Sequence, residues 1–359
     1  MSRTQKAIAA VVGADKPIFV DVPRPEAPAE DEVLCRTLQL GICGTDREIL
    51  ASKKPWVPDG EKFLVLGHEC LARVEAVGDN VTSLKPGELV VPTVRRALRP
   101  SNIRIDMLSF GDYTERGIVK QHGFSQEYWV ESPEYLLPVE ESLADIAVFA
   151  EPQSVAEKAV NEATLLQRAR LGEEVWNVRP PHILVTGQGP IAFAGLIAGV
   201  ARGWPVIMVG RDQGKTHRVE LALTLGAKGY VSYEEAASVA ANFELVLECT
   251  GSDDVLLNVS HLLSPCGIAV WLGAERVPVA RMHNVQRLMR LAILRNHLHL
   301  GSVNAAPRDF TDAIAHLAEM SRDCPDAIGQ VITSRATGTD VLTELRKRKP
   351  GSIKAVWKP

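Results

Sequence analysis

The 359-residue sequence has few cysteines, no long uninterrupted apolar run and no large excess of charge of either sign. Its six cysteines include no CxxC pair, which argues against a disulfide framework and favours a reducing, cytoplasmic compartment. A net charge of −4 gives no reason to expect a nucleic acid or an anionic membrane surface as partner. The longest apolar stretch, residues 183–201, is interrupted at Gly187-Gln188-Gly189-Pro190. We therefore expect a strand, a turn and a helix there, and not a membrane span.

The length of the chain predicts two domains, because a single hydrophobic core rarely grows this large. Up to about residue 150, short strand-like runs alternate with turn signals, which fits a barrel-like β unit. Helical periodicity follows from Ser154 to about Arg170, and Pro180-Pro181 marks a boundary. Strands and helices then alternate, which predicts a parallel, doubly wound sheet and an α/β fold class. The strands expected in this second part are residues 182–186, 205–209, 229–232, 245–248, 267–272 and 297–303.

Four residues are candidate metal ligands: Cys43 in GICGTD, His68 and Glu69 in LGHE, and Glu151 in AEP. A catalytic zinc site uses three ligands of the Cys, His and carboxylate types and keeps one position open. Taken singly, Cys43 would more often be a buried small side chain, and Glu151 a carboxylate at a helix start. When ionised, Cys43, Glu69 and Glu151 together overcompensate Zn²⁺, so one of the two glutamates is expected to ligate only part of the time. The sequence leaves open which one.

A phosphate-binding loop is indicated after the strand-like residues 183–185, where a helix-like run begins. Its glycine fingerprint carries alanine in place of the third glycine, which the fingerprint tolerates. The pyrophosphate of a dinucleotide is expected to face the start of this helix. The residues assigned to this loop are Gly187, Gln188, Gly189, Pro190 and Ile191.

The end of the second strand of the doubly wound sheet indicates which cofactor is bound. An NAD enzyme places an acid there to bind the ribose hydroxyl, whereas this chain has Gly210 followed by Arg211. A missing acid and an arginine favour the 2′-phosphate of NADP. Asp212 keeps NAD open as the alternative. Helpers for the phosphate would be Lys215, His217 or Arg218.

The order of these motifs resembles that of the zinc-dependent medium-chain dehydrogenases, and specifically their archaeal-type glucose dehydrogenase branch. The resemblance rests on GICGTDREI (41–49), LGHE (66–69), VVPTVRR (90–96), ERGI with HGF and EYW (115–129), YLLPV (135–139), EPQSVAEKA (151–159) and GSVNA (301–305). It implies a GroES-like β-barrel catalytic domain over residues 1–180, completed by residues 308–359, and a Rossmann domain over residues 181–307. It also implies one catalytic zinc per chain and a homodimer or homotetramer.

The resemblance assigns further roles residue by residue. Thr45 matches the hydroxyl that hydrogen-bonds the reacting alcohol, and Asp46 is a carboxylate expected to orient a ligand. Glu115, Asn304 and Glu151 are expected to bind the sugar together with Thr45. Asn304 also lies where the family contacts the nicotinamide, and Thr250 is expected at the cofactor. Thr45, Asp46 and Glu69 are the residues predicted to take part in catalysis.

One departure from the family is large. Relatives usually hold a second, structural zinc with four cysteines just after the VVPTVRR motif, but this chain has no cysteine between Cys70 and Cys249. Residues 97–108 replace that lobe, and a small apolar anchor is predicted in its place. Because the lobe borders the substrate in the family, the identity of the sugar or alcohol is left open. The predicted anchor consists of Ile103, Ile105, Met107 and Leu108.

The function expected first is oxidation of a sugar at its anomeric hydroxyl, with transfer of hydride to NADP and formation of a lactone. A second reading keeps the zinc but moves the chemistry to a polyol or another secondary alcohol. A third is a catalytically silent binding protein. The retention of Cys43, Thr45, His68, Glu69 and Glu151 together argues against this third reading.

Overall fold

The computed structural model describes residues 3–236, 242–274 and 283–359. The chain divides into two compact units: residues 1–151, 304–314 and 332–359, and residues 152–303 and 315–331. The division falls inside helices α2 (Ala150–Leu171) and α8 (Pro307–Asp323). It differs from the boundaries expected from sequence, which placed all of α2 before residue 180 and the whole tail in the first domain. No helix among the described residues is long and apolar enough to cross a membrane.

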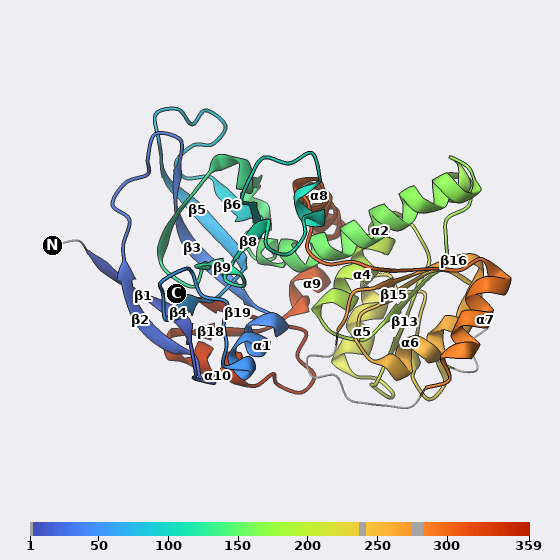
Figure 1. Ribbon diagram of the computed structural model, residues 1–359. Helices are drawn as coiled ribbons and strands as arrows, with labels where there is room; N and C mark the ends of the chain where they lie inside the picture. Colours follow the sequence, from blue (N-terminus) through green and yellow to red (C-terminus); the bar gives the residue numbers. More distant parts are fainter. Residues whose placement is uncertain (1–2, 237–241, 275–282) are drawn as a thin grey trace. The chain divides into compact units, whose positions relative to one another are not determined.

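The first unit is built mainly from three sheets, whose strands are coloured blue to green and red in Figure 1. The largest sheet has the order β11-β6-β5-β3-β19-β18, with β10 also paired to β3; the smaller sheets are β2-β1-β4 and β7-β8-β9. The strands are β1 (Thr4–Val11), β2 (Ile18–Pro23), β3 (Val33–Ile42), β4 (Phe63–Val65), β5 (Glu69–Val77), β6 (Leu89–Pro92), β7 (Arg95–Ala97), β8 (Tyr113–Arg116), β9 (Lys120–Gln121), β10 (Tyr128–Glu131), β11 (Leu136–Val139), β18 (Ile332–Thr337) and β19 (Lys354–Lys358).

Strand β3 is the centre of the large sheet, and most of its residues are buried. It pairs antiparallel with β5, β10 and β19, which occupy its hydrogen-bonding edges, and its apolar side chains belong to the core of this unit. The core around it includes Leu40, Phe124 and Trp129. Two helices of this unit, α1 (Gly44–Ser52) and α10 (Val341–Arg346), contact each other, and α1 follows directly on β3.

The second unit contains a six-stranded sheet of order β14-β13-β12-β15-β16-β17, in which every pairing is parallel. This is the strand order of a doubly wound dinucleotide-binding sheet. The strands are β12 (Ile183–Thr186), β13 (Val206–Gly210), β14 (Gly229–Ser232), β15 (Phe243–Glu248), β16 (Leu263–Trp271) and β17 (Leu298–Gly301). The helices are α3 (Val175–Val178), α4 (Pro190–Ala201), α5 (His217–Thr224), α6 (Asp253–Val259), α7 (Val285–Arg295) and α9 (Pro325–Ile328), with α2 and α8 shared between the units.

All six strands predicted for this sheet are found, with shifts of a few residues at their ends. The apolar stretch 183–201 forms strand β12, a loop and helix α4, as expected. Every residue of β12 is buried because the strand lies in the middle of the sheet and is covered on both faces. The alternation of strands and helices therefore predicted the second unit correctly.

Candidate active site

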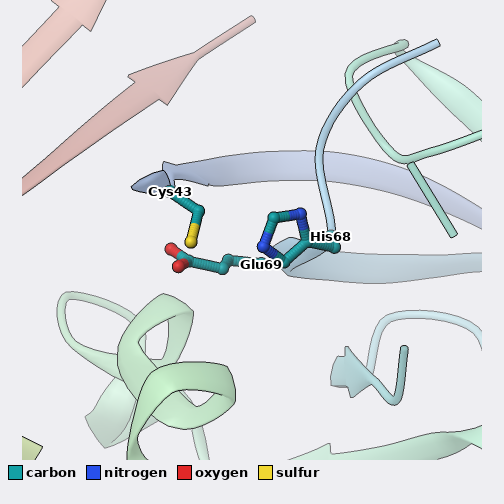
Figure 2. A group of neighbouring side chains, drawn as sticks. All are labelled: Cys43, His68 and Glu69. Atoms are coloured by element: carbon teal, nitrogen blue, oxygen red, sulfur yellow. The ribbon is translucent and has the colours of Figure 1, made fainter. Parts of the chain in front are cut away.

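Three candidate metal ligands meet because β3 and β5 are antiparallel neighbours. Gly41 near the end of β3 is paired with Glu69 at the start of β5, so Cys43, just after β3, lies beside His68 and Glu69. One ligand atom from each of Cys43, His68 and Glu69 lies within 4.8 Å of the others. Figure 2 shows the thiol, the imidazole and the carboxylate gathered at these two strand ends. The structure thus brings Cys43 together with His68 and Glu69, although helix α1 and strand β4 lie between them in the sequence.

Gly41 is required where it stands because Glu69 occupies the space beside it. A Cβ atom added at position 41 would lie 1.9 Å from Glu69 Oε2, which is far inside van der Waals contact. The glycine therefore makes room for the carboxylate of its cross-strand partner. Sequence reasoning included Gly41 in a motif but assigned it no role.

The Asp46 carboxylate lies next to two of the candidate ligands, Cys43 and His68. As the third residue of α1, it accepts a hydrogen bond from the Cys43 backbone amide at 2.8 Å through Oδ2, which fixes the start of the helix. Its other oxygen, Oδ1, lies 3.6 Å from His68 Nδ1. Thr45 Oγ1 lies 3.6 Å from Cys43 Sγ. Asp46 is thus placed beside His68 Nδ1, where it can orient the ring for metal binding through the other ring nitrogen.

The pKa values of His68 and Asp46 are shifted both by burial and by neighbouring charges. Burial lowers the pKa of His68, but the Asp46 carboxylate and the Cys43 sulfur raise it, and the pKa ends well above its usual value. Burial raises the pKa of Asp46, against the opposing effect of His68. Asp46 Oδ1 and His68 Nδ1 are both buried and without a hydrogen-bond partner within the described part of the chain. Such a set of groups is typical of a site that is completed by a cation.

Lys354 is a site residue that sequence reasoning missed. Its Nζ donates to both carboxylate oxygens of Glu69, at 2.5 and 2.6 Å, and both side chains are 1% exposed. The register explains the contact, because β19 pairs with β3 and places Ala355 opposite Ile42. A buried lysine balances one of the negative charges that the sequence analysis counted around the metal. The only sequence signal was a single lysine among apolar residues near the C-terminus.

Glu151 is buried at the start of α2 and lies outside the group of three ligand atoms. Burial raises the pKa of its carboxyl to about 7, with further contributions from His68, which lowers it, and Glu69, which raises it. These electrostatic partners show that Glu151 is near the ligand group. The four predicted ligands therefore separate into a converged set of three and one neighbouring carboxyl.

The donor set fits zinc. A thiolate, an imidazole and a carboxylate are the three ligand types of catalytic zinc sites, and the site has an orienting carboxylate in Asp46. Cys43, His68 and Glu69 could hold the ion, and Glu151 could replace Glu69. With zinc bound, such a site polarises a hydroxyl group.

Glu115 and Asn304 lie together in the first unit, as their predicted shared role requires. Asn304 Nδ2 donates to Glu115 Oε1 at 2.8 Å, and the Asn304 carbonyl oxygen accepts the Ala305 amide. The same Oε1 atom accepts from Arg95, which is a second polar residue that the sequence analysis did not single out. The two basic residues that follow Glu115 closely in sequence pair elsewhere: Arg116 with Glu131, and Lys120 with Asp59.

The phosphate-binding loop has the predicted context in the second unit. It connects β12 to α4, with Gly189 as the N-cap and Pro190 in the first turn. The Gln188 side chain reaches the end of β13, where its Oε1 accepts the amides of Arg211 and Asp212 at 2.9 and 3.1 Å. Gly210 makes room for it, since an added Cβ would lie 2.5 Å from Gln188 Cδ.

The two residues that would distinguish NADP from NAD differ in their contacts within the protein. The Asp212 carboxylate is held by Arg218 and by the Thr216 hydroxyl, which also lower its pKa although burial opposes them. Arg211 is exposed, and within the described ranges its guanidinium forms no ion pair with a carboxylate. At the end of β15, the buried Glu248 accepts from the Thr250 amide at 2.8 Å and from its hydroxyl. Glu248 thus fixes Thr250, a contact that was not predicted.

The predicted apolar anchor of residues 97–108 is wrong for two of its four members. Ile103 and Met107 are 60% and 47% exposed, and only Leu108 is buried. The buried residue in their midst is Asp106, whose carboxylate pairs with Arg104 at 2.5 Å. The segment is held by charged side chains, because its backbone carbonyls and carboxylates find arginine partners.

Two family models match the chain. Residues 29–141 match the alcohol dehydrogenase GroES-like domain, and residues 144–358 match the glucose dehydrogenase C-terminus. The chain is 35% identical over 317 residues to glucose 1-dehydrogenase 1 of Caldivirga maquilingensis, covering 88% of each protein. It is 36% identical over 299 residues to glucose 1-dehydrogenase of Thermoproteus tenax, covering 83% of each.

A solved structure is similar over the same extent. Glucose dehydrogenase of Haloferax mediterranei, in complex with NADP, Zn and gluconolactone, matches with a TM-score of 0.83 and 28% identity, over 99% of both chains. The predicted fold class, a GroES-like domain with a Rossmann domain, is confirmed by these matches and by the sheet order. The chain belongs to the glucose dehydrogenase family of the zinc-dependent medium-chain dehydrogenases and is an oxidoreductase of that family.

Proposed function

We propose that this protein oxidises the C1 hydroxyl of an aldose to a lactone, with NADP as hydride acceptor and one zinc ion per chain. The observation that carries the proposal is the convergence of Cys43, His68 and Glu69 in the same unit as Glu115 and Asn304. The first group suits zinc and the second suits sugar hydroxyls. The NADP, Zn and gluconolactone in the structure of the Haloferax mediterranei enzyme support the same reaction.

In this proposal, Cys43 and His68 hold the zinc throughout, and Glu69 and Glu151 share the remaining protein position. When bound, zinc supplies Lewis acidity that lowers the pKa of the substrate hydroxyl. Thr45 Oγ1 accepts the proton that leaves this hydroxyl and passes it toward solvent. Asp46 keeps the His68 ring in its orientation. Lys354 compensates Glu69 when that carboxylate is not a ligand.

The sugar is bound by carboxylate and amide groups of this chain. Glu115 accepts hydrogen bonds from hydroxyls next to the reacting carbon, and Asn304 donates or accepts beside it. Polar groups are needed there because each sugar hydroxyl must exchange hydrogen bonds with water for hydrogen bonds with protein. The hydride then passes from C1 to the nicotinamide of NADP.

Arg211 binds the 2′-phosphate of NADP in this proposal. Its guanidinium is exposed at the end of β13, whereas the nearby Asp212 is already paired with Arg218. An acid that is occupied in this way is a poor partner for the ribose hydroxyl of NAD. The pyrophosphate lies at the start of α4, against Gly187, Gly189 and their neighbours.

A panel of aldoses and polyols tests the proposal with both cofactors. The zinc-loaded protein is assayed through the nicotinamide absorbance, and the product of each active substrate is identified. Formation of an aldonolactone with NADP supports the proposal. Oxidation restricted to polyols or simple secondary alcohols, without lactone, would support the alternative reading, and inactivity toward all of them would support a silent binding protein. Metal analysis of the dialysed protein should give one zinc per chain.

We also propose that the protein is a cytoplasmic homodimer or homotetramer. Its six cysteines are all free, which suits a reducing compartment. Strand β17 ends the parallel sheet within the described residues, and several apolar side chains of the adjacent helix α7 are exposed. An unpaired strand edge beside exposed apolar residues is suited to a second copy. Light scattering on the purified protein measures the oligomeric state. The exposed residues are Val285, Met289, Ile293 and Leu294.

A further inference from the structure

Arg95 contacts Glu115 from the neighbouring strand. β7 and β8 are antiparallel, and Arg95 is paired in register with Glu115. Its Nε donates to Glu115 Oε1 at 3.0 Å and its Nη2 lies 2.9 Å from the same oxygen. The side chains of Arg95 and Glu115 are 4% and 9% exposed. A charge-assisted contact this well shielded from water fixes the geometry of both side chains.

Arg95 Nη1 and the face of the guanidinium also have contacts in the protein. Nη1 donates to the backbone carbonyl of Asp106 at 3.0 Å, and Cζ lies 3.7 Å from the ring centroid of Tyr113. The guanidinium therefore has a partner on each side and an aromatic ring on one face. Asp106 belongs to the segment 97–108, which by the resemblance stands in the place of the cysteine-rich lobe of relatives. Arg95 thus connects that segment to Glu115.

The contacts are distributed unequally over the two oxygens of Glu115. Oε1 accepts hydrogen bonds from Arg95 Nε and from Asn304 Nδ2, and Arg95 Nη2 lies within ion-pair distance of the same oxygen. Among the described residues, no hydrogen bond to Oε2 is formed. A carboxylate oxygen offers about two lone pairs, so Oε1 is saturated while Oε2 can still accept.

We propose that Arg95 is a positioning residue for sugar recognition, which holds Glu115 so that Oε2 is presented to one hydroxyl of the aldose. Arg95 also makes the segment 97–108 part of the specificity apparatus, because the same guanidinium holds both Asp106 of that segment and Glu115. This inference rests on the proposed function and deepens it. It assigns the discrimination between an aldose and its deoxy analogue to a residue that does not touch the substrate.

Arg96 provides a matched control. It is the next residue on β7, its side chain is 7% exposed, and it pairs with Glu131 and not with Glu115. Successive residues of a strand point to opposite faces, so the two arginines serve different partners. Arg95→Met removes the charge and all four contacts, Arg95→Lys keeps the charge, and Arg96→Lys disturbs a comparably buried pair. Glu115→Gln gives the reference for loss of the carboxylate.

The experiment compares kcat and KM for the best aldose substrate and each of its monodeoxy analogues. In the wild-type protein, removal of one particular hydroxyl should lower kcat/KM by about tenfold or more, because a hydrogen bond to a charged acceptor is lost. Arg95→Met should lower kcat/KM for the parent sugar by a similar factor and leave that one deoxy sugar nearly unchanged, as Glu115→Gln does. Arg95→Lys should restore part of the discrimination, and Arg96→Lys should keep all of it.

A second measurement is independent of activity. Arg99 and Arg104 lie in the segment that Arg95 holds, so trypsin should cut the segment faster in Arg95→Met and Arg95→Lys than in Arg96→Lys. If Arg95→Met does not fold, Arg95→Lys carries both tests. Equal losses for the parent and every deoxy sugar, or the same collapse of discrimination in Arg96→Lys, would overturn the role of Arg95. A wild-type protein that oxidises no aldose would instead overturn the proposed function.

Discussion

Replacement of Lys354 by methionine tests how much the positive charge of Lys354 stabilises the buried Glu69 carboxylate, because it removes the charge but keeps a side chain of similar length. Methionine is close to lysine in length and can occupy the same buried space, so little cavity should result. The change removes the ammonium that lies 2.5 and 2.6 Å from the two oxygens of Glu69. Both side chains are 1% exposed, so water cannot replace the lost partner. An uncompensated buried charge of this kind costs about 3–5 kcal/mol.

Zinc should offset much of this loss. In the zinc-free variant the Glu69 carboxylate has no counter-charge from position 354, whereas in the loaded variant the ion supplies one. We therefore expect urea unfolding to show a loss of about 3–5 kcal/mol without zinc and a smaller loss with zinc. If the two losses differ by ~1.4 kcal/mol or more, linkage requires zinc to bind the variant at least about tenfold more tightly than the wild type.

The double variant Lys354→Met, Glu69→Gln is the control. It removes both charges, so the zinc-free protein should regain part of the stability that the single variant lost, while the advantage in zinc affinity should disappear. Equal losses of unfolding free energy with and without zinc would refute the reasoning, because zinc would then not replace the Lys354 ammonium as the counter-charge of Glu69. A single variant that loses no stability without zinc would refute it as well.

Three further predictions concern single side chains. Gly41→Ala should displace Glu69 and weaken zinc binding, since the new Cβ would lie 1.9 Å from its Oε2; Gly229→Ala, also in a strand but with open space around it, is the control, and equal zinc affinity for both would contradict the prediction. Arg211→Ala should weaken NADP by about 10–150-fold, because one charge-assisted contact is lost, and leave NAD nearly unchanged; equal losses for the two cofactors would remove Arg211 from the phosphate site. Glu151→Gln should flatten the pH dependence of stability of the zinc-free protein. Because the pKa of Glu151 rises to about 7 on folding, from 4.5, its contribution is complete below pH 4.5 and is lost as pH rises from 4.5 through 7, a loss of roughly 3 kcal/mol. Parallel stability curves for wild type and Glu151→Gln over that range would show that the carboxyl is not perturbed.

The parts of the fold that local patterns encode were predictable from the sequence. Strand β12, its glycine loop and helix α4 follow from an apolar run interrupted by Gly187, Gly189 and Pro190. The candidate ligands Cys43, His68 and Glu69 could be named from their motifs. Their approach to one another depends on the register of β3 with β5, which fixes residues far apart in the chain and is not visible in any short pattern.

The charged partners of the site could not be predicted. Lys354 is 285 residues away from Glu69, and lysine is among the residue types least often fully buried. The sequence around either residue therefore does not predict that they pair. Arg95 is likewise defined by the pairing of β7 with β8. The segment 97–108 was misread because its apolar side chains were counted, whereas Asp106 and two arginines determine how it is held.

The central claim is that Cys43 helps to hold a zinc ion at which C1 of an aldose is oxidised. The most direct test follows an aldose labelled with ¹³C at C1 by NMR, with NADP and zinc, for the wild-type protein and for Cys43→Ala. Loss of a metal ligand should lower turnover by several orders of magnitude while the fold is kept, since the metal acts on the substrate. We expect the label to move to a lactone carbonyl in step with NADPH formation in the wild type, and this reaction to be lost in Cys43→Ala. Oxidation at another carbon, or unchanged lactone formation by Cys43→Ala, would contradict the account.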